Sequence, residues 1–503
     1  MRNLILLLIV FIQTQLTVCQ EVNEITTVLA DELNGSARYN AMAGAFGALG
    51  GDLSAVSLNP AGSSVFLHSE FGGTFSYTNQ TIQSSYYGST LSKEDHNSKF
   101  NQIGAIIVLN NTDTSSPWTR LSFGINGHTV ARFDQQATVL GRNSKSIDSY
   151  FLYYADGLPF ENLPLYENEE IKDVYRFLGE EKGYAAQQAF LGYQSYIINP
   201  FSFDDKETEY FSNLEYGQVD HKLDLLSKGV HRKTSLNFSG LYENVLHLGV
   251  NLNIHKLEYH SDQSFFESGH YSDSPVYNID FENKLSSYGE GVSVQLGAIF
   301  RLQNLRLGLV YDSPQFLDIS EETNQNISSM YVDQGVIFSE KIDPDITNQY
   351  EPYRLILPAK TTLSAAYIFG GKGLLSVDYS VQNAANTSLS RERGSGYLDN
   401  LTRSLPETFG ALQTLKVGGE YRFKDISLRA GVLNRTNPQK KLEVSDQAVT
   451  FGVGFDFGTN SLSLSFVQLN KSRNYSLFSE GLNDSYTLAN TFSQVSLSYN
   501  VKL

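Results

Sequence analysis

From Thr234 to the end of the chain, apolar residues alternate with polar or small ones in runs of about ten residues, which short turns separate. In one such run the apolar face consists of Leu415, Val417, Gly419, Tyr421 and Phe423, and the alternation resumes beyond the turn Lys424-Asp425 with Leu428, Ala430 and Val432. Side chains of a strand point alternately to its two faces, so this run predicts one face in lipid and one in water. Repeated along the chain, the pattern predicts an all-β fold, a transmembrane antiparallel β-barrel.

The same pattern gives a count of strands. Three candidates precede this region, near 71–86, 103–109 and 118–133. Five hairpin-linked pairs lie near 234–259, 290–311, 361–382, 414–434 and 449–470, and a last strand near 491–503. The prediction is therefore about fourteen strands, an even number as in bacterial single-chain barrels. The last strand alternates up to Leu503, so we expect the barrel-assembly machinery to be a partner during biogenesis.

The lengths of the connections predict the orientation of the barrel. Outer-membrane barrels have short periplasmic turns and longer outer loops, so the long connections are expected outside. They lie near 134–233, 260–289, 312–360, 383–413, 435–448 and 471–490. In the 134–233 insertion, apolar residues between Ile171 and Tyr196 recur every three to four positions, which predicts amphipathic helices. We expect a partly helical extracellular cap, with an interrupted strand pair as the alternative.

Residues 1–19 have the form of a secretory signal peptide, with an apolar run from Leu4 to Ile12 and small residues before a cleavage site after Cys19. Cys19 could instead be lipidated, although Val18 stands where Gly, Ala or Ser is usual. If cleavage follows Cys19, the mature chain has no cysteine. No other apolar stretch has the roughly 18 residues that a membrane helix needs.

Composition and motifs narrow the function. The formal net charge of -17 argues against binding to nucleic acid. The 30 tyrosines and 31 phenylalanines, against one tryptophan, suit aromatic girdles at membrane interfaces. The sequence contains no nucleophile elbow, phosphate loop, zinc pattern or credible catalytic carboxylate pair, so we expect no enzyme, no metal and no cofactor. Nine histidines invite a haem hypothesis, but the spacings of His247, His255, His260 and His270 form no known haem box, which favours histidines without a ligand.

Residues 20–64 differ from the rest of the chain, being rich in Gly and Ala and without lasting alternation. The segment from Ala43 to Gly62, with Asp52 before Asn59-Pro60-Ala61-Gly62, resembles the N-terminal hatch of the FadL-type family of hydrophobic-compound transporters. That family is marked by an Asn-Pro-Ala triplet just before its first strand. The resemblance continues through Gly291–Pro314, Leu357–Ala359 and Gly418–Gly431. The sequence of Gly35–Asp52 is similar to that of a branch of the family found in Bacteroidetes-type bacteria. Members of this branch are often labelled haemin receptors.

Together with the signal peptide (1–19), the resemblance divides the chain into a hatch (20–64) and a barrel (65–503) in the bacterial outer membrane, and the fourteen strands of the family match the number counted from the alternation. It implies a passive transporter without energy coupling, in which a long-chain fatty acid or similar hydrophobic compound is caught by outer loops and leaves sideways through an opening in the barrel wall. Its partners would be a hydrophobic ligand or lipid and outer-membrane lipid, and the protein would be a monomer. An outer-membrane component of a secretion or attachment machine, or a haemin receptor, is the alternative. The 134–233 insertion is larger than the resemblance accounts for, so the identity of the ligand stays open.

A sideways exit needs a break in the wall, and the third strand offers one. Its alternation is interrupted at Asn126-Gly127, as a bulge or kink would do, and Gly124 removes bulk from the same wall. The third strand is also the kinked one in the FadL-type family. We therefore expect Gly124, Asn126 and Gly127 to edge a lateral opening that faces Asn59-Pro60-Ala61; a lipid-side bulge without an opening is the alternative. The triplet itself is expected to be a rigid turn that holds the plug, or else simply a tight turn into the first strand.

Charged residues near the short turns predict how the hatch is held. Four arginines project inward by parity, with Glu420 on the same face; they are Arg301, Arg306, Arg422 and Arg429. We expect them to clamp the hatch carboxylates Asp52 and Glu32 through charge-assisted hydrogen bonds. Ordinary charges of a polar lumen are the alternative.

Overall fold

The computed structural model describes residues 25, 28–29, 32–113, 115–391 and 396–503. The expected signal peptide, 1–19, lies outside the described residues, as do its cleavage site and parts of the segment 20–31.

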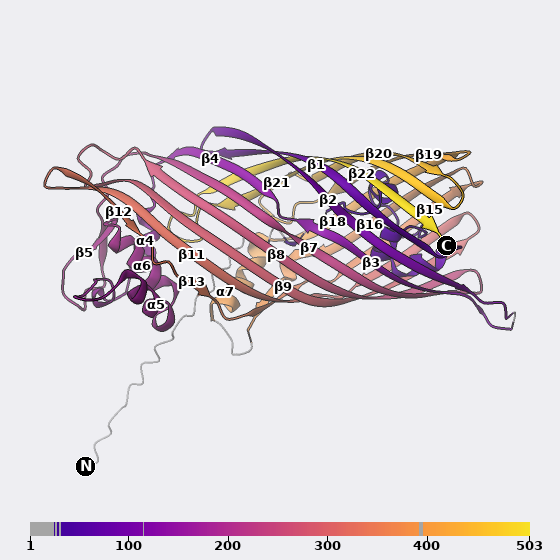
Figure 1. Ribbon diagram of the computed structural model, residues 1–503, viewed down its shortest axis with the longest axis horizontal. Helices are drawn as coiled ribbons and strands as arrows, with labels where there is room; N and C mark the ends of the chain where they lie inside the picture. Colours follow the sequence, from indigo (N-terminus) through magenta and orange to yellow (C-terminus); the bar gives the residue numbers. More distant parts are fainter. Residues whose placement is uncertain (1–24, 26–27, 30–31, 114, 392–395) are drawn as a thin grey trace, which may run out of the picture.

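Within the described part of the chain, fourteen strands form a closed antiparallel barrel, because each pairs with the next and β22 pairs with β1 (Figure 1). In ring order they are β1 (Glu70–Tyr86), β2 (Ser89–Asn110), β3 (Trp118–Arg132), β7 (Val219–Tyr242), β8 (Leu246–Ser268), β9 (Val276–Leu302), β10 (Leu305–Asp312), β15 (Lys360–Phe369), β16 (Gly373–Asn383), β18 (Ala411–Phe423), β19 (Ile426–Arg435), β20 (Asp446–Asp456), β21 (Asn460–Ser476) and β22 (Ser485–Lys502). The predicted fold class and number of strands are confirmed.

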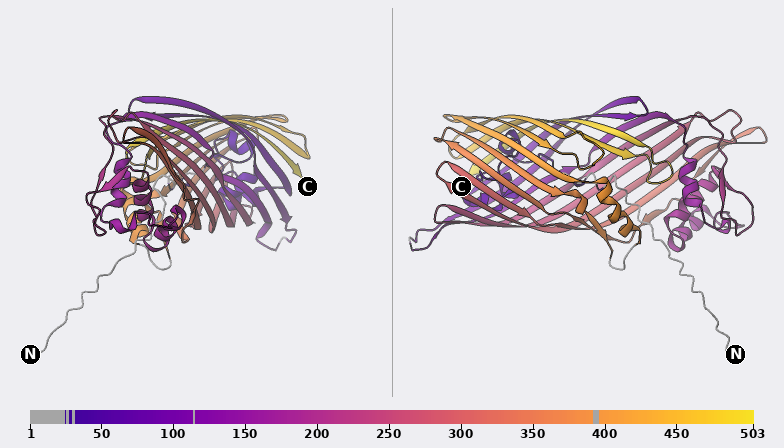
Figure 2. Two further views of the ribbon diagram at one scale, coloured as in Figure 1. Left: turned by 60° about the vertical axis from the view of Figure 1, so that its left-hand side comes forward. Right: turned by 180° about the vertical axis from the view of Figure 1, so that it is seen from behind.

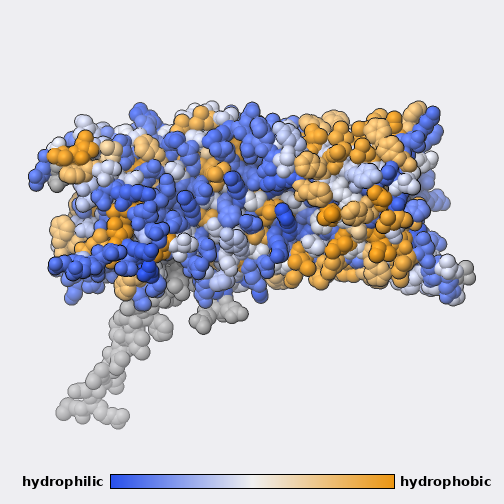
Figure 3. Space-filling model, viewed as in Figure 1, coloured by the Kyte–Doolittle hydropathy of each residue, from blue (hydrophilic) through white to orange (hydrophobic). Residues whose placement is uncertain are grey.

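The outer surface carries an apolar band over one half of the barrel, on the right in Figure 3. The band lies at the end where short turns join the strands and where the chain ends (Figure 1). On β18 and β19, Leu415, Tyr421 and Leu428 are exposed, whereas Glu420 and Arg429 are buried inside. The alternation of the sequence therefore separates a surface for lipid from a polar lumen, as predicted.

Beyond this band the strands continue into a long hydrophilic half. The connection expected as a loop at 260–289 is almost entirely strand, because β8 and β9 extend to Ser268 and Val276. Further strands lengthen the wall: β4 (Gln135–Asn143), β11 (Gln315–Asp333), β12 (Val336–Ile342), β13 (Thr347–Gln349), β14 (Tyr353–Leu357) and β17 (Ser388–Ser390). The expectation of long loops is wrong here for a physical reason: outside lipid both faces of a strand can be polar, so paired strands carry no apolar alternation.

The helical part of the 134–233 insertion lies at the outer end of the barrel, far from the apolar band (Figure 2). It contains α4 (Asp148–Ala155), η2 (Phe160–Asn162), α5 (Ile171–Glu181), α6 (Tyr184–Gln194) and the short strands β5 (Ile198–Pro200) and β6 (Tyr210–Ser212). The two predicted amphipathic helices are α5 and α6, and their Tyr175, Leu178 and Phe190 are buried in one core with Phe265 and Phe281 of the barrel strands. A 3-10 turn, η3 (Ala384–Asn386), and a helix, α7 (Gly396–Thr408), follow later in the chain. None of the helices in the described residues is long and apolar enough to cross a bilayer.

The hatch occupies the lumen at the level of the apolar band (Figures 1 and 2). It consists of α2 (Ala37–Ala41), α3 (Leu53–Leu58) and the 3-10 helix η1 (Pro60–Val65). Each begins at a capping side chain: Ser36 accepts from Tyr39 N, Asp52 from Ser54 N and Asn59 from Ala61 N. Helices this short are not stable alone, so the contacts with the wall determine where the hatch lies.

Candidate functional site

The Asn59-Pro60-Ala61 turn lies against glycines of the barrel wall. A Cβ on Gly249 would be 2.3 Å from the carbonyl carbon of Pro60, and one on Gly297 would be 2.0 Å from Asn59 Oδ1. Asn237 Nδ2 donates to Pro60 O at 2.9 Å, and Asn59 Nδ2 donates to Ala298 O at 3.3 Å. The turn is therefore seated on β7, β8 and β9 by close backbone contact.

Gly62 and the preceding part of the hatch pack against one another and against the wall. A Cβ on Gly62 would be 3.1 Å from the Cα of Gly50, and Gly51 N donates to Gly62 O at 3.1 Å. Asp378 of β16 accepts from the backbone N–H groups of Phe46, at 3.0 Å, and Gly47, at 2.9 Å. These buried hydrogen bonds hold the Phe46–Gly47 segment of the hatch against β16.

A salt bridge also holds the hatch, but its partners differ from those predicted. Glu420 on β18 accepts from Arg38 of α2, with Nε–Oε2 2.8 Å and Nη2–Oε1 3.3 Å. Arg429 donates to the same carboxylate, with Nε–Oε2 2.7 Å, while Arg422 Nη2 lies 3.7 Å from Oε1 and its side chain is half exposed. The hatch thus contributes the arginine and the wall the carboxylate, the reverse of the predicted arrangement.

The carboxylates predicted as clamp residues have other partners. Asp52 accepts from Ser36 Oγ at 2.8 Å in addition to capping α3. Glu32 accepts from Lys471 Nζ at 3.2 Å. Of the two remaining arginines, Arg306 donates to Leu49 O at 2.7 Å, and Arg301 lies near enough to Arg306 to repel it. An aspartate directly before a helical segment is an N-cap signal, which could have assigned Asp52 from the sequence.

The wall of the barrel is broken between β2 and β3. Their ladder runs from Asn110↔Arg120 to Gln102↔His128 and stops there. Among the described residues, β2 continues from Asn101 back to Ser89 paired with β1 alone, and β3 continues beyond His128 paired with β7 alone. The break begins next to Phe100 of β2, whose side chain is exposed on the outer surface.

We compared the chain and its fold with known proteins. No family model and no curated protein matches the chain. Among solved structures, a Pseudomonas aeruginosa FadL homologue matches 94% of this chain and 99% of its own, with a TM-score of 0.55 and 13% identity. The P. putida toluene transporter TodX matches 94% and 99%, with a TM-score of 0.52 and 14% identity. The chain has the FadL-type fold. The resemblance found in the sequence is confirmed at this level, and the barrel indicates an outer-membrane protein.

Within this FadL-type barrel, the residues predicted to edge an opening lie just before the break. Gly124, Asn126 and Gly127 still pair with β2, opposite Ile106, Gly104 and Ile103. The two irregularities in the pairing of β3 with β7 lie elsewhere, between Trp118 and Arg120 and, nearer the break, between Thr129 and Ala131. A Cβ on Gly127 would have its nearest neighbours at 3.9 Å, so this position does not require glycine.

Asn126 also faces a different part of the hatch from the one predicted. Its Nδ2 donates to Ser57 Oγ of α3 at 2.6 Å, and its Oδ1 accepts from Gln102 Nε2 at 2.9 Å. The Asn59-Pro60-Ala61 turn instead contacts the wall at β8 and β9. The expectation that Asn126 and Gly127 face that turn is therefore wrong, because the end of the β2–β3 ladder lies beside α3.

Side chains bridge the break in the FadL-type wall. Asp134, in the turn between β3 and β4, accepts from Asn97 Nδ2 of β2 at 2.9 Å and forms an ion pair with Lys99. The lumen behind the break holds a cavity, and a second cavity over the hatch shares Glu32 and Arg435 with it. Asn97 and Asp134 also line the first cavity, so the side chains that bridge the break form part of the wall of this cavity.

The histidines proposed for haem have protein partners. His247 Nδ1 contacts Ser64 Oγ at 2.8 Å, His255 contacts Ser293, His260 contacts Ser286, and His270 contacts Glu267. Within the described residues, no three or more His, Cys, Asp or Glu side chains are grouped so as to hold a metal ion.

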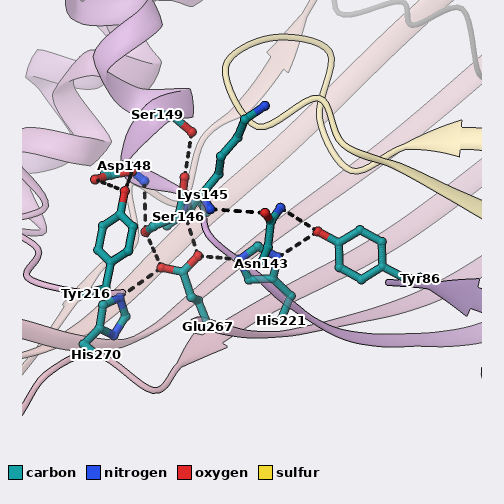
Figure 4. Close-up of polar contacts among 11 residues, drawn as sticks. Tyr86, Asn143, Lys145, Ser146, Asp148, Ser149, Tyr216, His221, Glu267 and His270 are labelled. Atoms are coloured by element: carbon teal, nitrogen blue, oxygen red, sulfur yellow. Dashed lines mark hydrogen bonds and ion pairs between the residues drawn. The ribbon is translucent and has the colours of Figure 1, made fainter. Parts of the chain in front are cut away.

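A buried polar cluster at the outer end ties the cap to the barrel (Figure 4). Glu267 of β8 accepts from Ile147 N at 2.9 Å, from His221 Nε2 at 3.0 Å and from His270 Nε2 at 3.0 Å, and it also accepts from Ser146 Oγ. Burial alone would raise the pKa of Glu267, but hydrogen bonds from His221 and His270 bring it below its ordinary value. The charged carboxylate therefore fixes the start of α4 on the barrel strands.

Proposed function

We propose that the protein is a passive transporter of hydrophobic compounds, such as long-chain fatty acids, and that the ligand leaves sideways between β2 and β3. The observation that carries this proposal is the combination of a hatch packed inside the lumen and an interrupted wall. Met42, Phe46 and Ala48 of the hatch are fully buried, whereas the β2–β3 ladder ends at Gln102↔His128.

The physical reasoning concerns where an apolar ligand is most stable. Transfer of apolar surface out of water is favourable, so a hydrophobic compound in the lumen gains free energy on entering lipid and needs no coupled energy source. The break starts next to Phe100, an apolar side chain that is exposed on the outer surface of the barrel. A ligand leaving there would enter the lipid layer directly.

Exit requires the side chains across the break to separate. The contacts of Asp134 with Asn97 and Lys99 join only side chains, and ion pairs of partly exposed groups are weak, on the order of 1 kcal/mol or less. Opening at this place therefore leaves the backbone ladders of the barrel intact. The FadL-type fold, shared with solved structures named as a FadL homologue and a toluene transporter, supports the same class of substrate.

Uptake by cells tests the proposal. Cells that lack their own fatty acid transporter would produce this protein and receive a radiolabelled long-chain fatty acid, labelled toluene or a labelled disaccharide. We expect uptake of a hydrophobic compound and exclusion of the disaccharide. Uptake of both hydrophobic probes at the level of cells without the protein would overturn the proposed function.

A further inference from the structure

Arg132, the last residue of β3, lies at the break with an unusual environment. Arg132 is buried, with only 9% of its surface exposed. Its Nε, Nη1 and Nη2 atoms have no hydrogen-bond partner among the described residues. Arginine stays charged at any physiological pH, and a buried charge without a partner is costly. Such a group suits a partner that arrives from outside the protein.

The carboxylates near Arg132 are bound to other residues. Glu32 accepts from Lys471 and from the backbone N of Arg132, and Asp134 accepts from Asn97 and Lys99. The third carboxylate that lines the cavity, Asp95, forms no hydrogen bond with the Arg132 guanidinium either. The positive charge of Arg132 is thus left without a direct counter-ion at the break.

The cavity that Arg132 lines is amphipathic. Beside the charged groups, apolar side chains from the end of β3 and from β1, β21 and β22 contribute to its wall: Ile82, Ala131, Phe133, Leu469, Leu488 and Phe492. A ligand with one anionic head and an apolar tail would satisfy both parts of this surface.

We propose that Arg132 binds the carboxylate of a long-chain amphiphile in this cavity before the ligand leaves through the break, an assignment that rests on the proposed function. The planar guanidinium matches a carboxylate with two parallel hydrogen bonds. A dianionic phosphate head is disfavoured because the carboxylates of Glu32 and Asp134 act on the same site. A neutral aromatic hydrocarbon would leave the guanidinium unsatisfied.

Binding to the purified full-length protein tests this assignment with three probes of equal chain length: a fatty acid, the fatty alcohol and the alkyl phosphate. The parent protein should prefer the acid. Arg132→Gln should weaken binding of the acid by about 10- to 100-fold, the usual effect of losing a hydrogen-bonded charge partner, and leave binding of the alcohol within about twofold. Arg132→Lys should retain part of the preference. Arg142→Gln is the matched control, because Arg142 is exposed and pairs with Asp220 at the outer end.

The outcomes separate the two proposals. If the parent binds none of the three probes, both the proposed function and this assignment are overturned. If acid and alcohol bind equally well, or if Arg132→Gln keeps the preference for the acid, only the role of Arg132 is overturned. Tighter binding of the alkyl phosphate would overturn the choice of a carboxylate. Should Arg132→Gln fail to fold, an unchanged preference in Arg132→Lys, whose ammonium cannot form the two parallel bonds, would likewise count against the assignment.

Discussion

The salt bridge between the hatch and the wall predicts a leaky variant, Glu420→Gln. This change keeps the shape of the side chain but removes the charge on which Arg38 and Arg429 converge. Both Nε groups donate to Oε2, and an amide oxygen in that place could still accept from them. The amide nitrogen would then replace Oε1 and could not accept from Arg38 Nη2, so Arg38 loses one hydrogen bond as well as its counter-charge. The hatch should therefore detach more often from its position against the barrel wall.

The structure sets the size of this effect. The side chains of Glu420 and Arg429 are each 5% exposed, and that of Arg38 is 23% exposed. Removing one partner of a buried ion pair costs about 3–5 kcal/mol, and the partial exposure of Arg38 places this case near the lower value. Since about 1.4 kcal/mol corresponds to a factor of ten, displaced hatches should become about a hundredfold more frequent. The hatch keeps its hydrogen bonds with Asp378 and its close contact with Gly249, so the barrel should still fold.

Conductance in planar bilayers measures this displacement directly. Glu420→Gln should show frequent openings to small ions that the parent protein rarely shows. Glu290→Gln is the control, because Glu290 is exposed and pairs only with the exposed Lys256. Equal conductance of Glu420→Gln and the parent, together with equal resistance to urea, would refute the reasoning that this salt bridge holds the hatch.

Three further predictions follow from single contacts. Gly249→Val should unseat the Asn59–Ala61 turn and raise conductance, since even a Cβ would meet Pro60 at 2.3 Å, whereas Gly419→Val, with 3.5 Å to its nearest neighbour, should not. Because the folded-state pKa of Glu267 lies below its ordinary 4.5, the stability that it gives the cap should be present above pH 4.5 and be lost as the pH falls through the lower folded-state value; Glu267→Gln should show increased protease cleavage of the cap already at pH 7. Gly127→Val should fold and transport normally, because the position has room for a side chain; loss of uptake there would contradict the placement of the irregularity beyond His128.

The membrane-spanning part of this fold could be predicted from the sequence because lipid imposes a pattern. Where one face of a strand meets lipid, alternation is required, and the predicted strands near 414–434 coincide with β18 and β19. The helix α5 could be predicted because its buried apolar residues recur with the helical period. The helix α6 was predicted in the right place, but it is buried along Ala186–Gly192 on several faces and is not amphipathic in the same sense. The hatch could be predicted because the Asn59-Pro60-Ala61 segment resembles the N-terminal hatch of the FadL-type family.

The parts that depend on pairing between distant segments could not be predicted. Parity placed Arg429 and Glu420 inside the lumen, but only the folded chain shows that Arg38, from a helix of five residues, meets them. The break beside Arg132 is a property of a ladder and not of one strand, so the sequence of β3 suggested its neighbourhood but placed the irregularity too early.

The central claim, exit between β2 and β3, is tested most directly by closing the break reversibly. Asn97→Cys and Asp134→Cys place two thiols where side chains now meet across the break, and a short bis(methanethiosulfonate) reagent would link them. Ile107→Cys with Phe123→Cys is the control pair, because these residues are already opposite each other in the intact ladder. We predict that linking 97 to 134 stops uptake of the labelled fatty acid, that a reducing agent restores it, and that the control link has no effect. Undiminished uptake with the 97–134 link complete would contradict the account.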